Sequence, residues 1–335
     1  MIKFALLGVG RIGKMHAQNI ILNPRSNLEI IYDSNTNLAK QVANSYDCKV
    51  ANSSEEAINS NVDAVLIATS TPTHIEYILK SAEAGKAIFC EKPIDLDITK
   101  VNRCKKKLEK FNVPIQLGFN RRFDFSHRKL KEEKNKGNIG NLEMIIISSR
   151  DPEPPSFEYL KESGGLFKDM TIHDFDMLSY ILGDDPIIEI TANSSVLFSN
   201  AAKKANDFDT AMFLAKSKSG ILCHINNSRR AVYGYDQRIE IYGSKGMLIS
   251  DNQSPTSVKK FNEFITSAED PSYHFFAERY EQAFRDQLDS FINALTEGKS
   301  PEVGFDDGRN ALILANAAYD SFYSKKTMFV NYELR

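Results

Sequence analysis

The chain has 335 residues, of which 42% are hydrophobic and 26% charged, and its formal net charge is −2 at pH 7. This length exceeds what one small core needs, so two domains are expected, and the composition is that of an ordinary globular protein. The small net charge argues against a nucleic-acid or anionic-membrane partner, and no stretch approaches the roughly 18 to 20 apolar residues of a membrane span.

Cysteine usage bears on the cellular compartment. The four cysteines are scattered and show no CxxC spacing: Cys48, Cys90, Cys104 and Cys223. This pattern favours reduced thiols and a cytoplasmic protein over a disulfide framework or a zinc site. Residues 1–4 run directly into a predicted strand and lack the basic head and apolar body of a signal peptide.

Predicted strands and helices alternate through residues 1–118. Apolar runs predict strands over residues 2–7, 28–32, 62–68, 87–90 and 114–117. Helical patterns cover residues 14–22, 38–45, 73–84 and 98–111, and residues 53–56 resemble the cap of a further short helix. This alternation predicts a parallel, doubly wound sheet with right-handed crossovers.

A glycine motif lies between the first strand and the first helix. Its residues are Gly8, Val9, Gly10, Arg11, Ile12 and Gly13. The first glycine would make a tight turn, the second would let a pyrophosphate reach backbone N–H groups, and the third would permit close packing of helix on sheet. A lone GxGxxG is weak, but the strand before it and the helix after it support a dinucleotide site.

Asp33 completes this motif, 20 residues past Gly13 at the end of the second strand. Its carboxylate would accept hydrogen bonds from the adenosine ribose hydroxyls and would repel a 2′-phosphate. Ser34 and Asn35 place no arginine beside it to compensate. We therefore expect NAD rather than NADP, and the alternative is that Asp33 merely caps the following turn.

Hydroxyl-bearing residues follow the strand at 62–68. Because open α/β sheets bind ligands at the carboxyl ends of their strands, these side chains suit contact with ribose and nicotinamide. The residues expected beside the cofactor are Thr69, Ser70, Thr71, Pro72 and His74. His74 is expected to begin a helix near the cofactor, not to act in catalysis.

Glu91, Lys92 and Pro93 follow the strand at 87–90. Lys92, held by the rigid proline after it, is placed to reach a ribose or substrate hydroxyl. Glu91 is a natural partner to fix its position. The alternative interpretation is a surface ion pair.

Beyond about residue 120 the pattern becomes α+β. Strands are predicted over residues 142–149, 187–198, 210–215, 220–227, 237–242 and 247–250, with a hairpin signal at 243–246. Helices are predicted over residues 123–136, 171–182, 276–295 and 307–324. This indicates one mostly antiparallel sheet with helices on one face, and its other face, if apolar, would be an oligomer interface. Residues 151–165 form a proline-rich loop and a candidate lid.

The most informative stretch lies just after that loop. On an α-helix, Asp169, His173 and Asp176 would share one face, and Gly164 and Gly165 before them would let a ligand approach the backbone. An imidazole with a carboxylate one turn away suits proton removal near neutral pH. Asp176 would orient His173 or serve as a capping or packing residue. A metal site is not expected, because hydride transfer does not need one.

Taken together, the glycine motif, residues 91–93 and residues 164–176 resemble the signature of the Gfo/Idh/MocA oxidoreductase family. Residues 120–124, 149–152 and 233–238 strengthen the resemblance to members that act on inositol. The resemblance covers essentially the whole chain. It implies an NAD-binding Rossmann domain over residues 1–120 and a substrate-binding and oligomerisation α+β domain over residues 121–335.

The family resemblance also implies an activity: NAD-dependent oxidation of myo-inositol at one ring hydroxyl, giving the 2-keto inosose, by a homotetramer assembled through the open sheet face. It implies that Lys92, Asp169 and His173 are catalytic. His173 suits the general base, Asp169 would bind a substrate hydroxyl and stabilise the imidazolium, and Lys92 would hydrogen-bond the reacting oxygen. The further expected substrate contacts are Asn120, Arg121 and Tyr235.

Three alternatives remain open at the level of the sequence. The first is an NAD-dependent dehydrogenase of another inositol isomer or of an aldose. The second is an enzyme that holds NAD tightly and oxidises and re-reduces a sugar. The third is a non-enzymatic, NAD-responsive regulatory protein.

Overall fold

A computed structural model gives the fold and describes residues 1–333. The chain divides into two compact units. The first holds residues 1–120, 284–312 and 333, and the second holds residues 121–283 and 313–332. Two of the boundaries fall inside helices α11 (Glu281–Glu297) and α12 (Phe305–Ser324). As a division of function, the assignment of residues 1–120 to NAD and 121–335 to substrate and oligomerisation stays a prediction.

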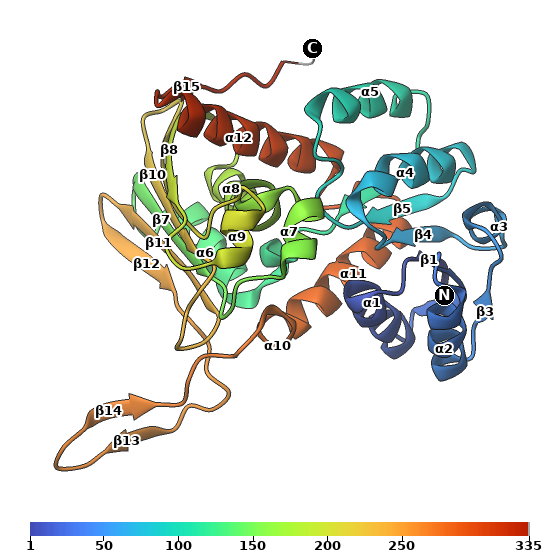
Figure 1. The fold of residues 1–335 in the computed structure, drawn as a ribbon, viewed down its shortest axis with the longest axis horizontal. Coiled ribbons are helices and arrows are strands. Elements are labelled where there is room, and N and C mark those ends of the chain that lie inside the picture. The colour runs from blue at the N-terminus through green and yellow to red at the C-terminus, as the bar shows by residue number, and fades with distance from the viewer. Residues whose placement is uncertain (334–335) are drawn as a thin grey trace. The chain divides into compact units, whose positions relative to one another are not determined.

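The first unit contains a six-stranded parallel sheet of order β3-β2-β1-β4-β5-β6, which confirms the predicted doubly wound arrangement (Figure 1). Its strands are β1 (Ile2–Leu7), β2 (Ser26–Tyr32), β3 (Lys49–Val50), β4 (Ala64–Ile67), β5 (Ala87–Cys90) and β6 (Ile115–Leu117). Strand β3 was not expected, because two residues are too few to show a periodic pattern.

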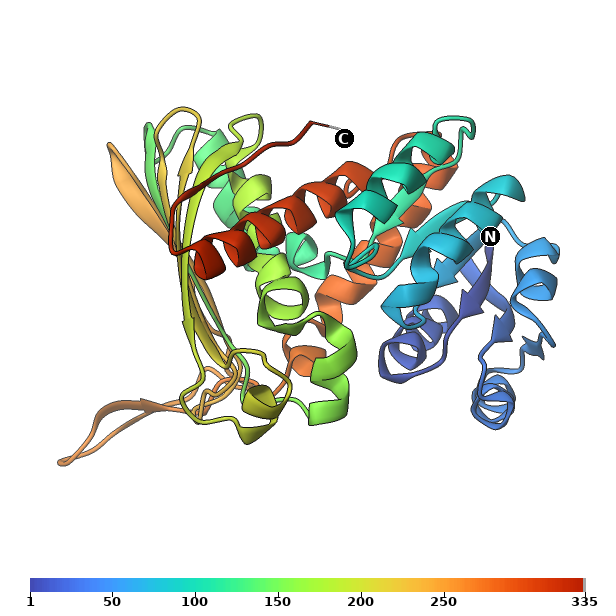
Figure 2. The same ribbon diagram turned by 45° about the horizontal axis from the view of Figure 1, so that its top comes forward.

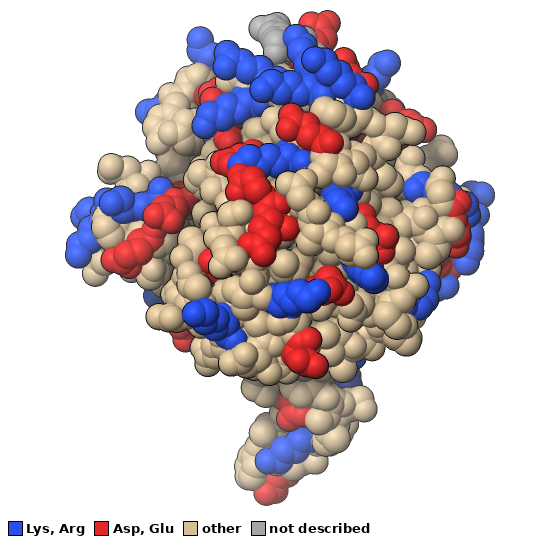
Figure 3. Space-filling view, turned by 90° about the vertical axis from the view of Figure 1, so that its right-hand side faces the viewer, with Lys and Arg blue, Asp and Glu red and all other residues tan. Residues whose placement is uncertain are grey.

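The helices of this unit follow the predicted ones: α1 (Arg11–Leu22), α2 (Thr36–Tyr46), α3 (Ser54–Asn59), the short η1 (Thr71–Thr73), α4 (His74–Glu83) and α5 (Ile98–Leu108). Ser53 caps α3 as expected, because its Oγ accepts the Glu56 N–H at 3.1 Å. On the protein surface, Lys and Arg gather over α5 (Figure 3), whose last turn carries Lys105, Lys106 and Lys107.

Aromatic packing joins α11 to the first sheet. The ring of Phe291 lies 6.2 Å from that of Phe4 in β1 and 5.7 Å from that of Phe89 in β5, measured between centroids. All three residues are fully buried. Residues far apart in the sequence therefore complete one core.

The second unit contains a seven-stranded sheet of order β12-β11-β7-β10-β9-β8-β15. Its strands are β7 (Leu142–Arg150), β8 (Ile187–Ser195), β9 (Thr210–Ser217), β10 (Leu222–Ser228), β11 (Asp236–Gly243), β12 (Gly246–Ser250) and β15 (Met328–Phe329). Only the β7–β10 pair is parallel, so the sheet is mostly antiparallel as predicted.

Strand β8 ends earlier than its apolar pattern suggested, at Ser195 instead of residue 198. The buried carboxylate of Asp209 accepts the backbone N–H groups of Leu197, Phe198 and Ser199 at 2.7 to 3.0 Å. These bonds turn the chain into the short helix α9 (Asn200–Lys204).

Helices cover one face of the seven-stranded sheet, and the other face is open (Figure 2). The helical segments of the unit are η2 (Asn120–Phe123), α6 (Phe125–Asn135), α7 (Phe157–Ser163), η3 (Leu166–Met170), α8 (Thr171–Leu182), α9 and α10 (Phe276–Arg279), together with the end of α12. The open face carries exposed apolar side chains: Met144, Met212, Leu214, Leu222, Tyr242, Met247 and Ile249. We call it the open face below.

Three further segments depart from the sequence expectations. The candidate lid contains the helix α7, which begins where Ser156 Oγ accepts the Tyr159 N–H. The expected helix over residues 276–295 is two helices, α10 and α11, because Tyr280 leaves helical geometry while its ring is buried against Tyr235. A hairpin of β13 (Lys259–Phe261) and β14 (Thr266–Glu269) extends away from the sheet (Figures 1 and 2).

Within residues 1–333, no helix combines the length and apolarity that crossing a bilayer demands.

Candidate active site

The glycine turn of the first unit has the geometry that its motif predicts. Gly8 has a φ of +87°, and a Cβ there would lie 2.6 Å from the Ala68 carbonyl oxygen. A Cβ at Gly13 would lie 2.0 Å from the Gly8 oxygen, so helix and strand pack too closely for any side chain. A Cβ at Gly10 would meet no atom within 4 Å. Helix α1 begins after Gly10 with no side-chain cap, which leaves backbone N–H groups for a phosphate.

Asp33 at the end of β2 holds the glycine turn in place. Its Oδ2 accepts the Val9 N–H at 2.8 Å, and its Oδ1 accepts the Asn35 N–H at 2.8 Å. The turn-capping alternative is thus seen in the structure. Each carboxylate oxygen keeps a second lone pair, so capping and acceptance of ribose hydroxyls are compatible. Contacts of Asp33 and of the first-turn residues Arg11 and Ile12 with a cofactor stay predictions.

The residues after β4 form a compact polar turn. Thr69 Oγ1 lies 2.7 Å from Thr73 Oγ1. The buried His74 has Nδ1 2.7 Å from the Pro93 oxygen and Nε2 3.0 Å from the Thr69 oxygen, and burial lowers the pKa of its imidazole. His74 therefore connects the segments that follow β4 and β5. Its contact with the cofactor, like those of Ser70, Thr71 and Pro72, stays a prediction.

Glu91 anchors the segment that carries Lys92. Its Oε1 lies 2.7 Å from Nε2 of the buried His16, and its Oε2 accepts the Lys92 backbone N–H at 3.3 Å. Only 13% of the Glu91 side chain is exposed. The ion pair with Lys92 that was weighed as an alternative stays untested. The Lys92–Pro93 peptide is cis. A Cβ at Gly118 would lie 2.6 Å from Glu91 Oε2, so β6 packs directly against this carboxylate.

In the second unit, Asp169 and His173 lie in different helical elements, and that they share one face stays a prediction. Asp169 lies in η3, a π-helical turn in which the Thr171 N–H donates to the Leu166 oxygen five residues earlier, whereas His173 lies in the first turn of α8. The buried Asp207 produces this turn, because its Oδ1 accepts the Leu166 N–H at 2.9 Å. A Cβ at Gly165 would lie 2.5 Å from the same oxygen.

Asp169 is 8% exposed, and side chains from two other segments donate to its carboxylate. The hydroxyl of Tyr159 in α7 donates to Oδ1 at 2.9 Å, and Nη2 of Arg229 donates to Oδ2 at 3.2 Å. Neither donor was identified from the sequence, because neither lies within a recognised motif.

The carboxylates beside His173 fasten α8 to the rest of the unit. Asp174 is fully buried and accepts from Arg121 Nη1 at 2.6 Å, Ser149 Oγ at 2.5 Å and Asn227 Nδ2 at 2.8 Å. These three donors come from η2, β7 and β10. Sequence reasoning missed Asp174. Two adjacent arginines, Arg121 and Arg122, together with two acids spaced two residues apart, were a usable signal for a pair of ion pairs.

Asp176 forms a two-pronged ion pair with Arg122, with Nε–Oδ2 and Nη2–Oδ1 distances of 2.8 and 2.6 Å. Both side chains are more than nine-tenths buried. Of the two roles considered for Asp176, the structure therefore shows the packing role.

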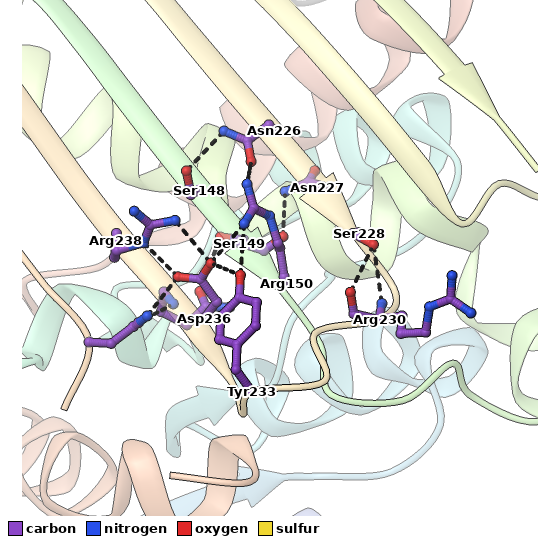
Figure 4. Close-up of polar contacts among 12 residues, drawn as sticks. Ser148, Ser149, Arg150, Asn226, Asn227, Ser228, Arg230, Tyr233, Asp236 and Arg238 are labelled. Atoms are coloured by element: carbon purple, nitrogen blue, oxygen red, sulfur yellow. Dashed lines mark hydrogen bonds and ion pairs between the residues drawn. The ribbon is translucent and has the colours of Figure 1, made fainter. Parts of the chain in front are cut away.

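Residues 233–238 form a polar group centred on Asp236 at the open face (Figure 4). Asp236 accepts from Tyr233 Oη at 2.6 Å, Arg238 Nε at 2.7 Å and Arg150 Nη1 at 3.1 Å. These bonds fix the chain on one side of Tyr235, whose backbone N–H donates to the Tyr273 oxygen at 2.8 Å.

The ring of Tyr235 is buried edge-on against Tyr280, with centroids 6.0 Å apart, and burial raises the pKa of its hydroxyl. Asn120 is buried at the start of η2, and Arg121 follows it. Their contacts with a substrate stay predictions. Lys92 belongs to the first unit and Asp169 and His173 to the second, so their convergence on one substrate is likewise a prediction.

Comparison with known families adds a separate observation. A model described as an oxidoreductase family with an NAD-binding Rossmann fold matches residues 2–119, and a GFO/IDH/MocA C-terminal domain model matches residues 127–249. The two matches span most of both units. The chain belongs to the Gfo/Idh/MocA oxidoreductase family. The resemblance seen in the motifs is confirmed.

Relatives of this Gfo/Idh/MocA oxidoreductase match it over nearly its full length. It is 41% identical over 332 residues to an inositol 2-dehydrogenase of Rhizobium meliloti (strain 1021), with 98% of this chain and 99% of the relative covered. A structure of a myo-inositol dehydrogenase from Corynebacterium glutamicum ATCC 13032 is 40% identical, with a TM-score of 0.95 and coverage of 99% and 100%. A scyllo-inositol dehydrogenase from Lactobacillus casei, solved with NAD(H) and scyllo-inositol, is 29% identical, with a TM-score of 0.91 and coverage of 98% and 99%.

The first unit of this Gfo/Idh/MocA oxidoreductase fits NAD. The open space beside Gly10 and the uncapped start of α1 match the pyrophosphate of a dinucleotide. The carboxylate of Asp33 matches its ribose. Among the described residues, no three His, Cys, Asp or Glu side chains are grouped as a metal ion would require.

Proposed function

We propose that this Gfo/Idh/MocA oxidoreductase oxidises myo-inositol with NAD to 2-keto-myo-inositol (scyllo-inosose). The observation that carries the proposal is the 41% identity to an inositol 2-dehydrogenase over 98% of the chain. The buried, hydrogen-bonded surroundings of Asp169 and the segment anchored by Glu91 around Lys92 support it, because these are the residues that the family motif assigns to the chemistry.

The proposed reaction removes a hydride and a proton from one secondary alcohol. Bound NAD⁺ supplies the hydride acceptor. His173 takes the hydroxyl proton as general base, since neutral imidazole accepts a proton near neutral pH. Asp169 accepts a hydrogen bond from a neighbouring hydroxyl and stabilises the imidazolium that forms. The Lys92 ammonium donates to the reacting oxygen and favours its alkoxide character.

The remaining hydroxyls of a neutral polyol call for donors and acceptors without an unbalanced charge. We assign them to Asn120, Arg121 and Tyr235. The ion pair between Arg121 and Asp174 supports this assignment, because the guanidinium charge is already balanced within the protein and its other N–H groups act as ordinary donors.

The cofactor contacts that we propose are those of the glycine motif, Asp33 and the two strand-end segments. NAD is preferred over NADP because the Asp33 carboxylate, held in place by its hydrogen bonds to Val9 and Asn35, would repel a 2′-phosphate.

We propose that the protein is a homotetramer assembled through the open face and located in the cytoplasm. The exposed apolar side chains of that face support assembly, as do Phe261 and Phe264 on the hairpin, which are 63% and 84% exposed. All four cysteines are free thiols, as a reducing compartment would maintain them.

A polyol panel tests the function. Purified protein is given NAD and myo-inositol, scyllo-inositol, other inositols or aldoses at mildly alkaline pH, and NADH is followed by absorbance. We expect the highest kcat/KM with myo-inositol. A higher value with scyllo-inositol, which the Lactobacillus casei relative binds, would make that isomer the substrate. NADH from no inositol would refute the proposal, and tight NAD binding without turnover would favour either the enzyme that oxidises and re-reduces a sugar or the regulatory alternative.

The variant His173→Ala tests the assigned base, and His274→Ala, which removes an exposed histidine of the same unit, is the matched control. His173→Ala should lose kcat by about 100-fold or more while NAD affinity changes little. Equal loss of kcat and NAD affinity would mean that His173 serves structure or cofactor binding instead.

A further inference from the structure

Arg229 lies directly after β10 and is 4% exposed, yet no motif includes it. Its Nη1 donates to Asp151 Oδ2 at 3.2 Å, and its Nη2 donates to Asp169 Oδ2 at 3.2 Å. The backbone N–H of Arg229 donates to the Asp209 oxygen at 2.8 Å, which fixes the base of the side chain. The guanidinium of Arg229 thus bridges Asp151, the residue after β7, and Asp169, whose carboxylate we expect to bind the substrate.

A third carboxylate faces the same group. Asp207, which produces the π-helical turn around Asp169, interacts electrostatically with Arg229. Arg229 is therefore a positive charge among three largely buried carboxylates, Asp151, Asp169 and Asp207. Arg121 also acts electrostatically on Asp151. Without Arg229, the mutual repulsion of the three carboxylates and their burial would both favour protonation of at least one of them. Burial already raises the pKa of Asp151, and the charge of Arg229 opposes that rise.

The Asp169 carboxylate is held at both oxygens by different donors. Tyr159 of the candidate lid donates to Oδ1 and Arg229 donates to Oδ2. A carboxylate oxygen can accept two hydrogen bonds, so a bond from a protein donor does not by itself exclude a substrate hydroxyl. The arrangement fixes the orientation of the carboxylate and favours its ionised form, and both are needed to accept a hydroxyl and to stabilise an imidazolium.

We propose that Arg229 is a positioning residue of the dehydrogenase. It holds Asp169 charged and in one orientation, and it connects that carboxylate to Asp151, the first residue of the candidate lid. Arg229 acts through Asp169 and does not itself touch the reacting atoms. This proposal rests on the proposed function, because Asp169 has its role only if a polyol is oxidised.

The test compares three variants of the full-length protein. Arg229→Gln removes the charge, and Arg229→Lys keeps the charge but lacks the two separate guanidinium nitrogens with which Arg229 reaches Asp151 and Asp169. Arg230→Gln is the matched control, since Arg230 is the next residue, is exposed and places its guanidinium 3.9 Å from the centre of the Phe198 ring. For each, kcat/KM for myo-inositol is measured against pH, and NADH affinity is measured by fluorescence titration.

We expect Arg229→Gln to lower kcat/KM by about 10- to 100-fold, because a small misplacement of a substrate-binding group has effects of this size. The acid limb of its pH profile should move to higher pH, since Asp169 protonates more readily. Arg229→Lys should keep the wild-type acid limb and still lose about tenfold in kcat/KM. NADH affinity should stay within about twofold throughout, and Arg230→Gln should match the wild type.

Wild-type rates and an unmoved pH profile in Arg229→Gln would overturn the proposal, as would a parallel loss of NADH affinity. If Arg229→Gln does not fold, Arg229→Lys decides, and a lysine variant with wild-type kcat/KM refutes the bridging role. Failure of the proposed function is distinct, because the wild type would then produce no NADH from any inositol.

Discussion

Replacing Asp174 by asparagine removes the charge that balances Arg121 in the second unit. Both side chains are largely buried, with exposed fractions of 0% and 6%. Breaking a buried pair at one partner leaves an uncompensated charge and costs about 3 to 5 kcal/mol in the free energy of unfolding. The amide group adds to this loss. If its oxygen keeps the bonds to Arg121 and Ser149, its NH₂ faces the NH₂ of Asn227, and two donors then oppose each other.

Urea unfolding followed by circular dichroism measures this loss, and Asp184→Asn, at an exposed position nearby, is the control that should stay within about 0.5 kcal/mol of the wild type. The double variant Arg121→Met with Asp174→Leu should recover much of the stability, because apolar side chains replace both charges. The reasoning is refuted if Asp174→Asn lies within about 1 kcal/mol of the wild type, or if the double variant is less stable than either single variant.

Further predictions concern titration, thiols and cofactor choice. Burial lowers the pKa of His127 from 6.5 to about 4. Between these pH values, His127 is therefore protonated in the unfolded chain but neutral in the folded protein. Stability should fall by about 3 kcal/mol as the pH drops through that window, and the same slope in His127→Gln would contradict this origin. Burial raises the pKa of Cys104 and Cys223 to about 12, so maleimide should label them at pH 7.5 far more slowly in native than in urea-unfolded protein by mass spectrometry, and rapid native labelling would contradict it. Asp33→Ser should raise the ratio of kcat/KM for NADP to that for NAD by about tenfold or more, whereas an unchanged ratio would show that repulsion by Asp33 does not set the preference.

Much of the fold follows from local patterns in the sequence. Continuous apolar runs identify β1, β4 and β5, because strands of a parallel sheet are buried on both faces. The elements that escaped detection lack such a pattern. Strand β3 has two residues, and the strands of the hairpin are largely exposed, so neither has an apolar period to show.

The contacts within the site were less predictable than the residues that the motif marks. Arg229 and Asp169 are 60 positions apart, and Arg121 and Asp174 are 53 apart, so no local spacing reveals these pairs. An acid beside His173 on a predicted helix has the appearance of a solvent-facing residue, yet Asp174 is fully buried. The π-helical turn at Asp169 likewise depends on a carboxylate supplied by Asp207, from a distant loop.

The packing of Phe291 against Phe4 and Phe89 bears on how the polypeptide reaches its native state. When only residues 1–120 have emerged from the ribosome, all six strands of the first sheet are present, but Phe291, whose ring packs against Phe4 and Phe89, has not yet been synthesised. The amino-terminal fragment would therefore emerge with an apolar surface exposed, and it should need either the rest of the chain or a chaperone before it becomes protease-resistant.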